Sequence, residues 1–209
     1  MQQAQPHICV FASSSVKLEQ LHYQFAHALG EELGKQGCAL VFGGGRVGLM
    51  GACADGVLHN DGRVIGVIPA LLNQPGIPHL GCHELIETPT MHIRKETMEH
   101  MADAFISLPG GFGTLEELLE VITLKQLGYH QKPIVICNVG GYYDALLEQF
   151  ETGFATGFAN IAYETLYCVA YTPIEAVTLA LTPSVESHLP DKMADSREAA
   201  NDPFNEVLS

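Results

Sequence analysis

The sequence predicts an α/β protein, a Rossmann-like three-layer fold with a mostly parallel β-sheet and helices on both faces. Short apolar runs alternate with longer runs that have the apolar spacing of amphipathic helices. The short runs are almost continuously apolar, as parallel strands covered on both sides are. Two of them end in glycine-rich stretches, and loops at the carboxyl ends of parallel strands form the binding sites of such sheets.

Seven apolar runs are predicted to be strands. They cover residues 7–11, 38–42, 63–68, 84–88, 104–108, 134–137 and 166–170. The third ends at Pro69 and the sixth begins after Pro133, because proline cannot donate to a strand ladder. Residues 70–90 otherwise read as loop, since three prolines interrupt them.

Six segments are predicted to be helices from apolar residues spaced three or four positions apart. They cover residues 16–35, the segment after Gly51 to about 59, 91 to about 101, the segment from the 109–113 loop to 127, 142 to about 150, and a short stretch from 173. In the first of them Leu18, Phe25 and Leu33 share one side, and Gly37 marks its end.

Composition predicts one domain of ordinary size, spanning residues 1–183, followed by an acidic polar tail at 184–209. The tail carries six acidic and two basic residues. The formal net charge of −14 argues against nucleic acid and anionic membranes as partners. A small phosphorylated ligand bound by local donors remains compatible with it.

Six cysteines without a C-x-x-C pair favour a reducing compartment. Residues 1–6 are too short and polar to precede a signal sequence, and no apolar run approaches the roughly 20 residues that span a bilayer. We therefore expect a cytoplasmic protein. His79 and His83 have the H-x-x-x-H form, but no further ligand set accompanies them, so we expect no metal site.

The stretch from Pro109 to Glu117, P-G-G-F-G-T-L-E-E, joins a strand to a helix. Its three glycines leave no Cβ in the way of a ligand, and a helix N-terminus offers unpaired N–H donors, so the combination predicts a phosphate site. The alternative is a plain turn in which Thr114 caps the helix and Glu117 completes a capping box.

A second glycine stretch, Gly43 to Gly48, matches the dinucleotide pattern G-x-G-x-x-G. A nicotinamide site would need an acidic residue at the end of the next strand, and residues 65–69 hold none. We expect this loop to be a second backbone cradle lining the same cleft. The run from Ser13 to Ser15 either donates to a ligand or caps the following helix.

The helix at 91–101 places Arg94 and Lys95 on a face that is otherwise apolar. Buried cations need a carboxylate, a phosphate or water. Lys95 has an alternative as an exposed partner of Glu99 at i+4, whereas no acid stands four positions from Arg94. We therefore expect Arg94 to have a functional role and not a purely structural one.

The helix after the 109–113 loop carries Glu116 and Glu117, which point about 100° apart and cannot flank one bond. It is apolar on two sides, with Leu118 and Leu119 on the main face and Val121 on a second. A helix buried on two sides predicts a subunit contact near the cleft.

Three motifs together resemble the Lonely Guy family of cytokinin-activating enzymes, once labelled lysine decarboxylases. They are G-G-G-x-x-G-L-M-G at 43–51, M-H-x-R-K at 91–95 and P-G-G-x-G-T-x-x-E at 109–117, and the resemblance runs from about residue 7 to 181. It implies a Rossmann-like fold, a homodimer or higher homo-oligomer, and hydrolysis of a nucleoside 5′-monophosphate to free base and ribose 5-phosphate. It implies no cofactor.

By position, the resemblance implies that Arg94 and Glu117 are catalytic. The substrate contacts that follow from it and from the loops are Ser14, Gly43, Gly44, Met91, Lys95, Gly110, Gly111, Phe112, Gly113, Thr114, Leu115, Glu116 and Thr123. The first loop reads F-A-S-S-S where the family commonly has C-G-S-S, and the tail lies outside the resemblance.

Three other classes of function stay open from the sequence. One is a non-catalytic nucleotide or cofactor carrier of the same fold. Another is a pyridoxal-phosphate decarboxylase, which needs a Schiff-base lysine such as Lys95 or Lys125. The last is a scaffold that neither binds nor turns over a nucleotide.

Overall fold

The computed structural model describes residues 5–183 of the chain, which form a seven-stranded sheet. Every neighbouring pair of strands is parallel. From one edge to the other the strands are β4 (Glu84–Thr88), β3 (Arg63–Pro69), β2 (Ala39–Phe42), β1 (His7–Phe11), β5 (Ala104–Ser107), β6 (Ile134–Cys137) and β7 (Cys168–Ala170). The predicted fold class is confirmed.

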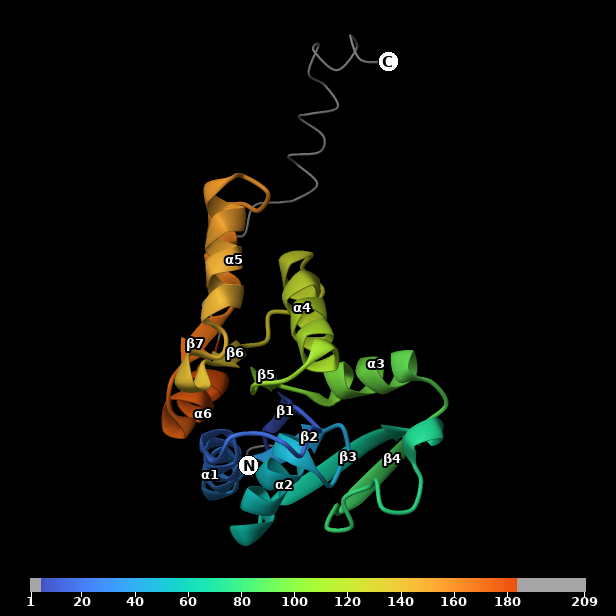
Figure 1. Ribbon diagram of the computed structural model, residues 1–209. Coiled ribbons are helices and arrows are strands. Elements are labelled where there is room, and N and C mark those ends of the chain that lie inside the picture. Colours follow the sequence, from blue (N-terminus) through green and yellow to red (C-terminus); the bar gives the residue numbers. More distant parts are fainter. Residues whose placement is uncertain (1–4, 184–209) are drawn as a thin grey trace.

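Helices cover both faces of this sheet (Figure 1). They are α1 (Gln20–Lys35), α2 (Gly48–His59), α3 (Met91–Met101), α4 (Phe112–Gln126), α5 (Asp144–Ala155) and α6 (Pro173–Leu181). Three 3-10 turns, η1 (Ala70–Leu72), η2 (Val139–Gly141) and η3 (Ile161–Leu166), lie in the connections. Helices α1, α2 and α6 pack on one face, and α3, α4 and α5 on the other.

Two buried clusters correspond to the two faces of the sheet, because successive side chains of a strand point in opposite directions. In β1, Ile8 and Val10 belong to the cluster under α1, α2 and α6, whereas Cys9 and Phe11 belong to the cluster under α3 and α4. This explains why the strands read as continuous apolar runs. All six cysteines are unpaired.

The backbone of Ser13, just after β1, ties three loops together. Its N–H donates to the carbonyl of Pro109 at 3.3 Å, and its carbonyl accepts from the N–H of Leu49 at 2.8 Å. Strand β1 lies between β2 and β5, so the loops that follow these three strands meet at one edge of the sheet.

Two helices begin later than the sequence predicts. Helix α1 starts at Gln20 rather than Val16, because the preceding backbone is held by other groups: the Ser13 carbonyl by Leu49, and the Ser15 carbonyl by the Tyr23 hydroxyl at 3.2 Å. Helix α5 starts at Asp144 rather than 142 and continues to Ala155.

The glycine-rich helix starts also differ from expectation. The N-cap of α4 is Gly111, so Thr114 lies inside the first turn and the capping box with Glu117 is wrong. Helix α2 begins at Gly48, within the glycine stretch. Strand β7 is shorter than predicted, because Leu166 ends the turn η3.

The acidic tail predicted at 184–209 lies outside the described residues. Within residues 5–183, no helix has the length and apolar character needed to cross a membrane.

Candidate active site

A cavity of about 610 Å³ opens at the carboxyl ends of the strands. Its walls come from the loops after β1, β2 and β5, from the end of β3 with the connection that follows it, and from the first turn of α3. The lining residues are Ala12, Ser13, Ser14, Ser15, Gly43, Gly45, Val47, Met50, Ile68, Leu72, Ile77, Met91, Arg94, Gly111, Gly113, Thr114 and Glu117.

An ion pair between Arg94 and Glu117 lies in the wall of this cavity. Nη1 of Arg94 donates to Oε1 of Glu117 at 2.7 Å, and the side chains are only 8% and 12% exposed. Nε of Arg94 donates to the carbonyl of Val67 at 3.0 Å, which fixes the guanidinium to the end of β3. Burial raises the pKa of Glu117, although the charge of Arg94 opposes this rise. The result is a fixed carboxylate with increased basicity.

Gly43 provides the space in which the Arg94 guanidinium lies. A Cβ at this position would collide with Nη2 of Arg94 and would also approach the sulfur of Met50 at 3.1 Å. The first glycine of the G-x-G-x-x-G loop is therefore required because any side chain there would displace Arg94 of α3.

The N-terminus of α4 presents open backbone donors to the cavity. The first N–H groups of an α-helix have no intrahelical acceptor. A side chain at Gly111 or Gly113 would meet nothing within 4 Å, so both positions face open space. Thr114 is 4% exposed and packs against Gly110, where no Cβ would fit. This end of the cavity suits an anion.

The N-terminus of α2 differs, because its donors are already occupied. The N–H groups of Leu49 and Met50 both point to the Ser13 carbonyl, at 2.8 and 3.3 Å. Gly48 has φ +67°, and a Cβ there would lie 2.5 Å from the Ser13 oxygen. The predicted second cradle therefore lines the cavity as a wall, and the open backbone donors lie at the start of α4.

The opposite end of the cavity is apolar. It is lined by Val47 from the Gly43–Gly48 stretch, Met50 from the first turn of α2, Ile68 from β3, and Leu72 and Ile77 from the following connection. Backbone hydrogen bonds hold this connection against the Gly43–Gly48 loop. The N–H of Arg46 donates to the carbonyl of Ile77 at 3.0 Å, and the N–H of His79 donates to the carbonyl of Gly44 at 2.8 Å. A flat and largely apolar group fits such walls.

Lys95 and Glu116, predicted to contact substrate, do not line this cavity. Nζ of Lys95 pairs with Glu116 and, at 2.7 Å, with Glu120, both on α4. Burial acts to lower the pKa of Lys95, but hydrogen bonds to the two carboxylates outweigh it and raise the pKa. The alternative prediction, an exposed Lys95–Glu99 pair, is wrong, because both carboxylates that pair with Lys95 belong to α4.

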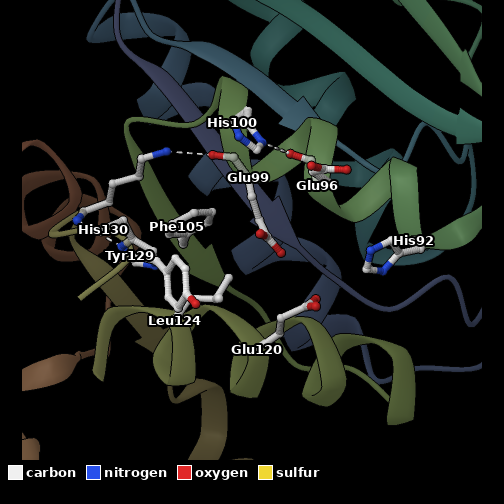
Figure 2. A pocket seen from close by; sticks show the side chains of 10 residues that line it. His92, Glu96, Glu99, His100, Phe105, Glu120, Leu124, Tyr129 and His130 are labelled. Carbon is white, nitrogen blue, oxygen red and sulfur yellow. Dashed lines mark hydrogen bonds between the residues drawn. The ribbon is translucent and has the colours of Figure 1, made fainter. Parts of the chain in front are cut away.

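Glu120 of this charged cluster also lines a second cavity, of about 370 Å³, to which α3 and α4 both contribute. Figure 2 shows Glu99 of α3 and Glu120 of α4 directed into the space between these helices, with Phe105 and His130 at the left of the view. Burial, together with the charge and hydrogen bonding of Glu120, raises the pKa of Glu99 to about 7.

Of the residues predicted to contact substrate, six line the cavity: Ser14, Gly43, Met91, Gly111, Gly113 and Thr114. Five others, besides Lys95 and Glu116, lie outside its lining: Gly44, Gly110, Phe112, Leu115 and Thr123. Phe112 is 92% exposed, Leu115 packs against the buried cluster, and the Thr123 hydroxyl donates to its own helix at Leu119.

Sequence reasoning missed the apolar lining. Val47 and Met50 lie inside a motif that was recognised for its glycines, so their positions could have been inferred. Leu72 and Ile77 carried no signal, because they lie in a proline-interrupted connection without periodicity.

The two histidines of the H-x-x-x-H segment have structural partners. Nε2 of His79 lies 3.0 Å from Oδ1 of Asp55, and Nδ1 of His83 accepts from the N–H of Val64 at 3.2 Å. Among residues 5–183, no group of three or more His, Cys, Asp or Glu side chains is placed to hold a metal ion.

Comparison with known sequences gives one family and several relatives. The model of a family described as possible lysine decarboxylase matches residues 50–180. The chain is 48% identical over 151 residues to the probable cytokinin riboside 5′-monophosphate phosphoribohydrolase LOGL1 of Oryza sativa subsp. japonica, covering 72% of this chain and 68% of that one. It is 47% identical over 153 residues to the cytokinin riboside 5′-monophosphate phosphoribohydrolase LOG7 of Arabidopsis thaliana, covering 73% and 70%.

Solved structures with the same fold are more distant in sequence. A molybdenum cofactor binding protein from Rippkaea orientalis superposes with a TM-score of 0.65 at 21% identity, covering 85% of this chain and 96% of that one. The molybdenum cofactor carrier protein of Chlamydomonas reinhardtii gives 0.61 at 22% identity, covering 83% and 94%. At these identities the likeness supports the fold alone.

Proposed function

The chain belongs to the Lonely Guy family, once labelled lysine decarboxylases, and on this premise we propose that it hydrolyses the N-glycosidic bond of nucleoside 5′-monophosphates. The products are the free base and ribose 5-phosphate. The observation that carries the proposal is the buried Arg94–Glu117 pair lying in one cavity with the open N-terminus of α4.

In the proposed reaction, positive charge develops on the ribose ring as the bond to the base breaks. The Glu117 carboxylate stabilises this charge and orients or deprotonates the attacking water. Its raised pKa makes it a stronger base than an exposed glutamate. Arg94 holds Glu117 in place and contacts substrate oxygens, so it is a positioning group; a guanidinium is a poor proton donor.

The 5′-phosphate is assigned to the first turn of α4, where Gly111, Gly113 and Thr114 line the cavity. Backbone N–H groups and the helix dipole favour an anion there. The base is assigned to the apolar end, near Met91, Leu72 and Ile77. These apolar walls favour, as substrate, a nucleotide whose adenine carries an apolar substituent, such as isopentenyl-AMP, over unsubstituted AMP.

The rival classes find less support in this geometry. A carrier of nucleotides or cofactors would share the fold and the anion site, but it has no need of a buried carboxylate beside the ribose. A pyridoxal-phosphate enzyme needs a lysine facing the cavity. Lys95 is held by two carboxylates, and Lys125 lines a different cavity, beside Pro133 and Cys168.

We also propose a homodimer in the cytoplasm. Helix α4 buries Leu118 and Val121 but leaves Leu119 41% exposed, so part of its apolar surface has no cover within residues 5–183. Light scattering of the purified full chain tests this, and a monomer at micromolar concentration would contradict it.

The activity is tested by chromatography of AMP, GMP, CMP, dAMP and isopentenyl-AMP after incubation with the purified protein. We expect release of free base, fastest from isopentenyl-AMP, together with ribose 5-phosphate. Calorimetric binding of AMP without base release would favour a carrier, and neither binding nor release would favour a scaffold.

A further inference from the structure

The turn between β6 and α5 reaches the loop that precedes α4. Its residues 138–144 read N-V-G-G-Y-Y-D. The hydroxyl of Tyr142 donates to the carbonyl of Gly110 at 2.7 Å, and the hydroxyl of the next residue, Tyr143, donates to the carbonyl of Leu108 at 2.7 Å. Two consecutive tyrosines therefore bind two carbonyls of the 108–111 segment.

The turn is built to hold both rings in place. Gly140 and Gly141 have φ values of +62° and +77°, which side chains other than glycine rarely adopt. The Asn138 side chain accepts from the N–H of Tyr143 at 2.8 Å and donates to Asp144 at 2.7 Å. The two tyrosine rings pack edge to face, with centroids 5.0 Å apart.

The bond from Tyr142 determines the direction of an amide in the anion site. In a trans peptide, the carbonyl of one residue and the N–H of the next point to opposite sides. No peptide bond in the described residues is cis. With the Gly110 carbonyl held on Tyr142, the N–H of Gly111 points the other way, and Gly111 lines the cavity whereas Gly110 does not.

We propose that Tyr142 is a positioning residue for the 5′-phosphate, because its hydroxyl fixes the Gly110–Gly111 peptide with the Gly111 amide facing the anion site. This inference rests on the proposed function for the identity of the ligand. It also explains why Gly110 lies in the motif without lining the cavity: its carbonyl is held from the opposite side.

Tyr143 has a different role, in the fold. It is 1% exposed, and its hydroxyl also contacts the Ser107 hydroxyl at 3.1 Å in the strand end. The carbonyl that it binds is followed by Pro109, which has no N–H to orient. Tyr142 is 48% exposed, so removal of its oxygen alone leaves the core intact.

The test compares Tyr142→Phe with Tyr171→Phe, a 62% exposed tyrosine outside the cavity, by calorimetric titration with AMP and with adenosine. We expect Tyr142→Phe to weaken AMP binding about 3- to 10-fold, the size of one hydrogen bond, and to leave adenosine binding unchanged. Tyr171→Phe should change neither. In turnover, KM for the monophosphate rises by the same factor while kcat stays within about twofold.

An AMP affinity of Tyr142→Phe within twofold of wild type would overturn the inference, as would an equal loss for AMP and adenosine. Calorimetry separates this outcome from failure of the proposed function, since binding needs no turnover. A wild-type protein that binds AMP without releasing base would refute hydrolysis and leave Tyr142 testable. A wild-type protein that does not bind AMP would overturn both.

Discussion

The guanidinium of Arg94 occupies the space that a side chain at Gly43 would need. The Gly43–Gly48 loop and α3 can approach each other here only because residue 43 has no Cβ. Gly43 does not have a positive φ, so its requirement is for space and not for an unusual backbone conformation.

Gly43→Ala should therefore displace Arg94 and lower turnover of the monophosphate by about 100-fold, as small misplacements in active sites do. The control is Gly153→Ala in α5, where the added methyl group meets nothing within 4 Å. This control should turn over normally and gain about 1 kcal/mol in helix stability at most. Normal turnover by Gly43→Ala would show that Arg94 is not needed where it lies.

Glu117→Gln should retain nucleotide binding and lose base release by about 100-fold or more, since it removes the charge and keeps the shape. The wild-type rate should also fall as the pH is lowered through the raised pKa of Glu117, because only the carboxylate stabilises the ribose cation. Rate profiles from pH 4 to 9 for both proteins check this. An unaltered rate in the variant would remove Glu117 from the mechanism.

Lys95→Met should affect stability more than catalysis, because Lys95 joins α3 to Glu116 and Glu120 outside the cavity. We expect a loss of about 1 kcal/mol in the free energy of unfolding, discounted for the exposure of Glu116, and turnover within about threefold of wild type. Urea unfolding and initial rates measure the two effects. If KM for AMP instead rose tenfold while adenosine binding stayed constant, Lys95 would be a direct phosphate contact.

Glu99→Gln should change how stability depends on pH. The pKa of Glu99 is raised from 4.5 to about 7, so the folded chain holds this proton more tightly than the unfolded chain does. The resulting stabilisation is complete below pH 4.5 and is lost as pH rises to about 7. The groups around Glu99 are Glu96, Lys95 and His100 on α3, Glu120 on α4, and His130 and Lys132 beyond.

Thermal melts of the wild type and Glu99→Gln between pH 4.5 and 8 measure this difference. The wild-type Tm should fall relative to the variant across that range. The control is Glu148→Gln, at an exposed position of α5, and its curve of Tm against pH should be parallel to that of the wild type. Parallel curves for all three proteins would refute the shift.

The fold class and the central strands were predictable because β2, β3 and β6 are almost continuous apolar runs with glycine or proline beside them. The starts of α3 and α6 were also predictable, but the start of α1 was not, because a distant group holds the preceding backbone: the Ser13 carbonyl accepts from the N–H of Leu49. Arg94 was expected to have a functional role because no acid stands four positions away, and the structure places it in the cavity wall. Local spacing did not predict the partners of Lys95. Its ion pairs are with Glu116 and Glu120 of the neighbouring helix α4, and not with Glu99 on its own helix.

The connection between β3 and β4 has a consequence for engineering. It is fastened by main-chain bonds at Arg46 and His79 and sends Leu72 and Ile77 into the cavity, while α4 and its glycines lie on a different connection of the sheet. In the proposed complex, one connection contacts the base and the other holds the phosphate. Substitutions at Leu72 and Ile77 are therefore expected to change which base the hydrolase prefers without changing its affinity for the ribose 5-phosphate part of the substrate.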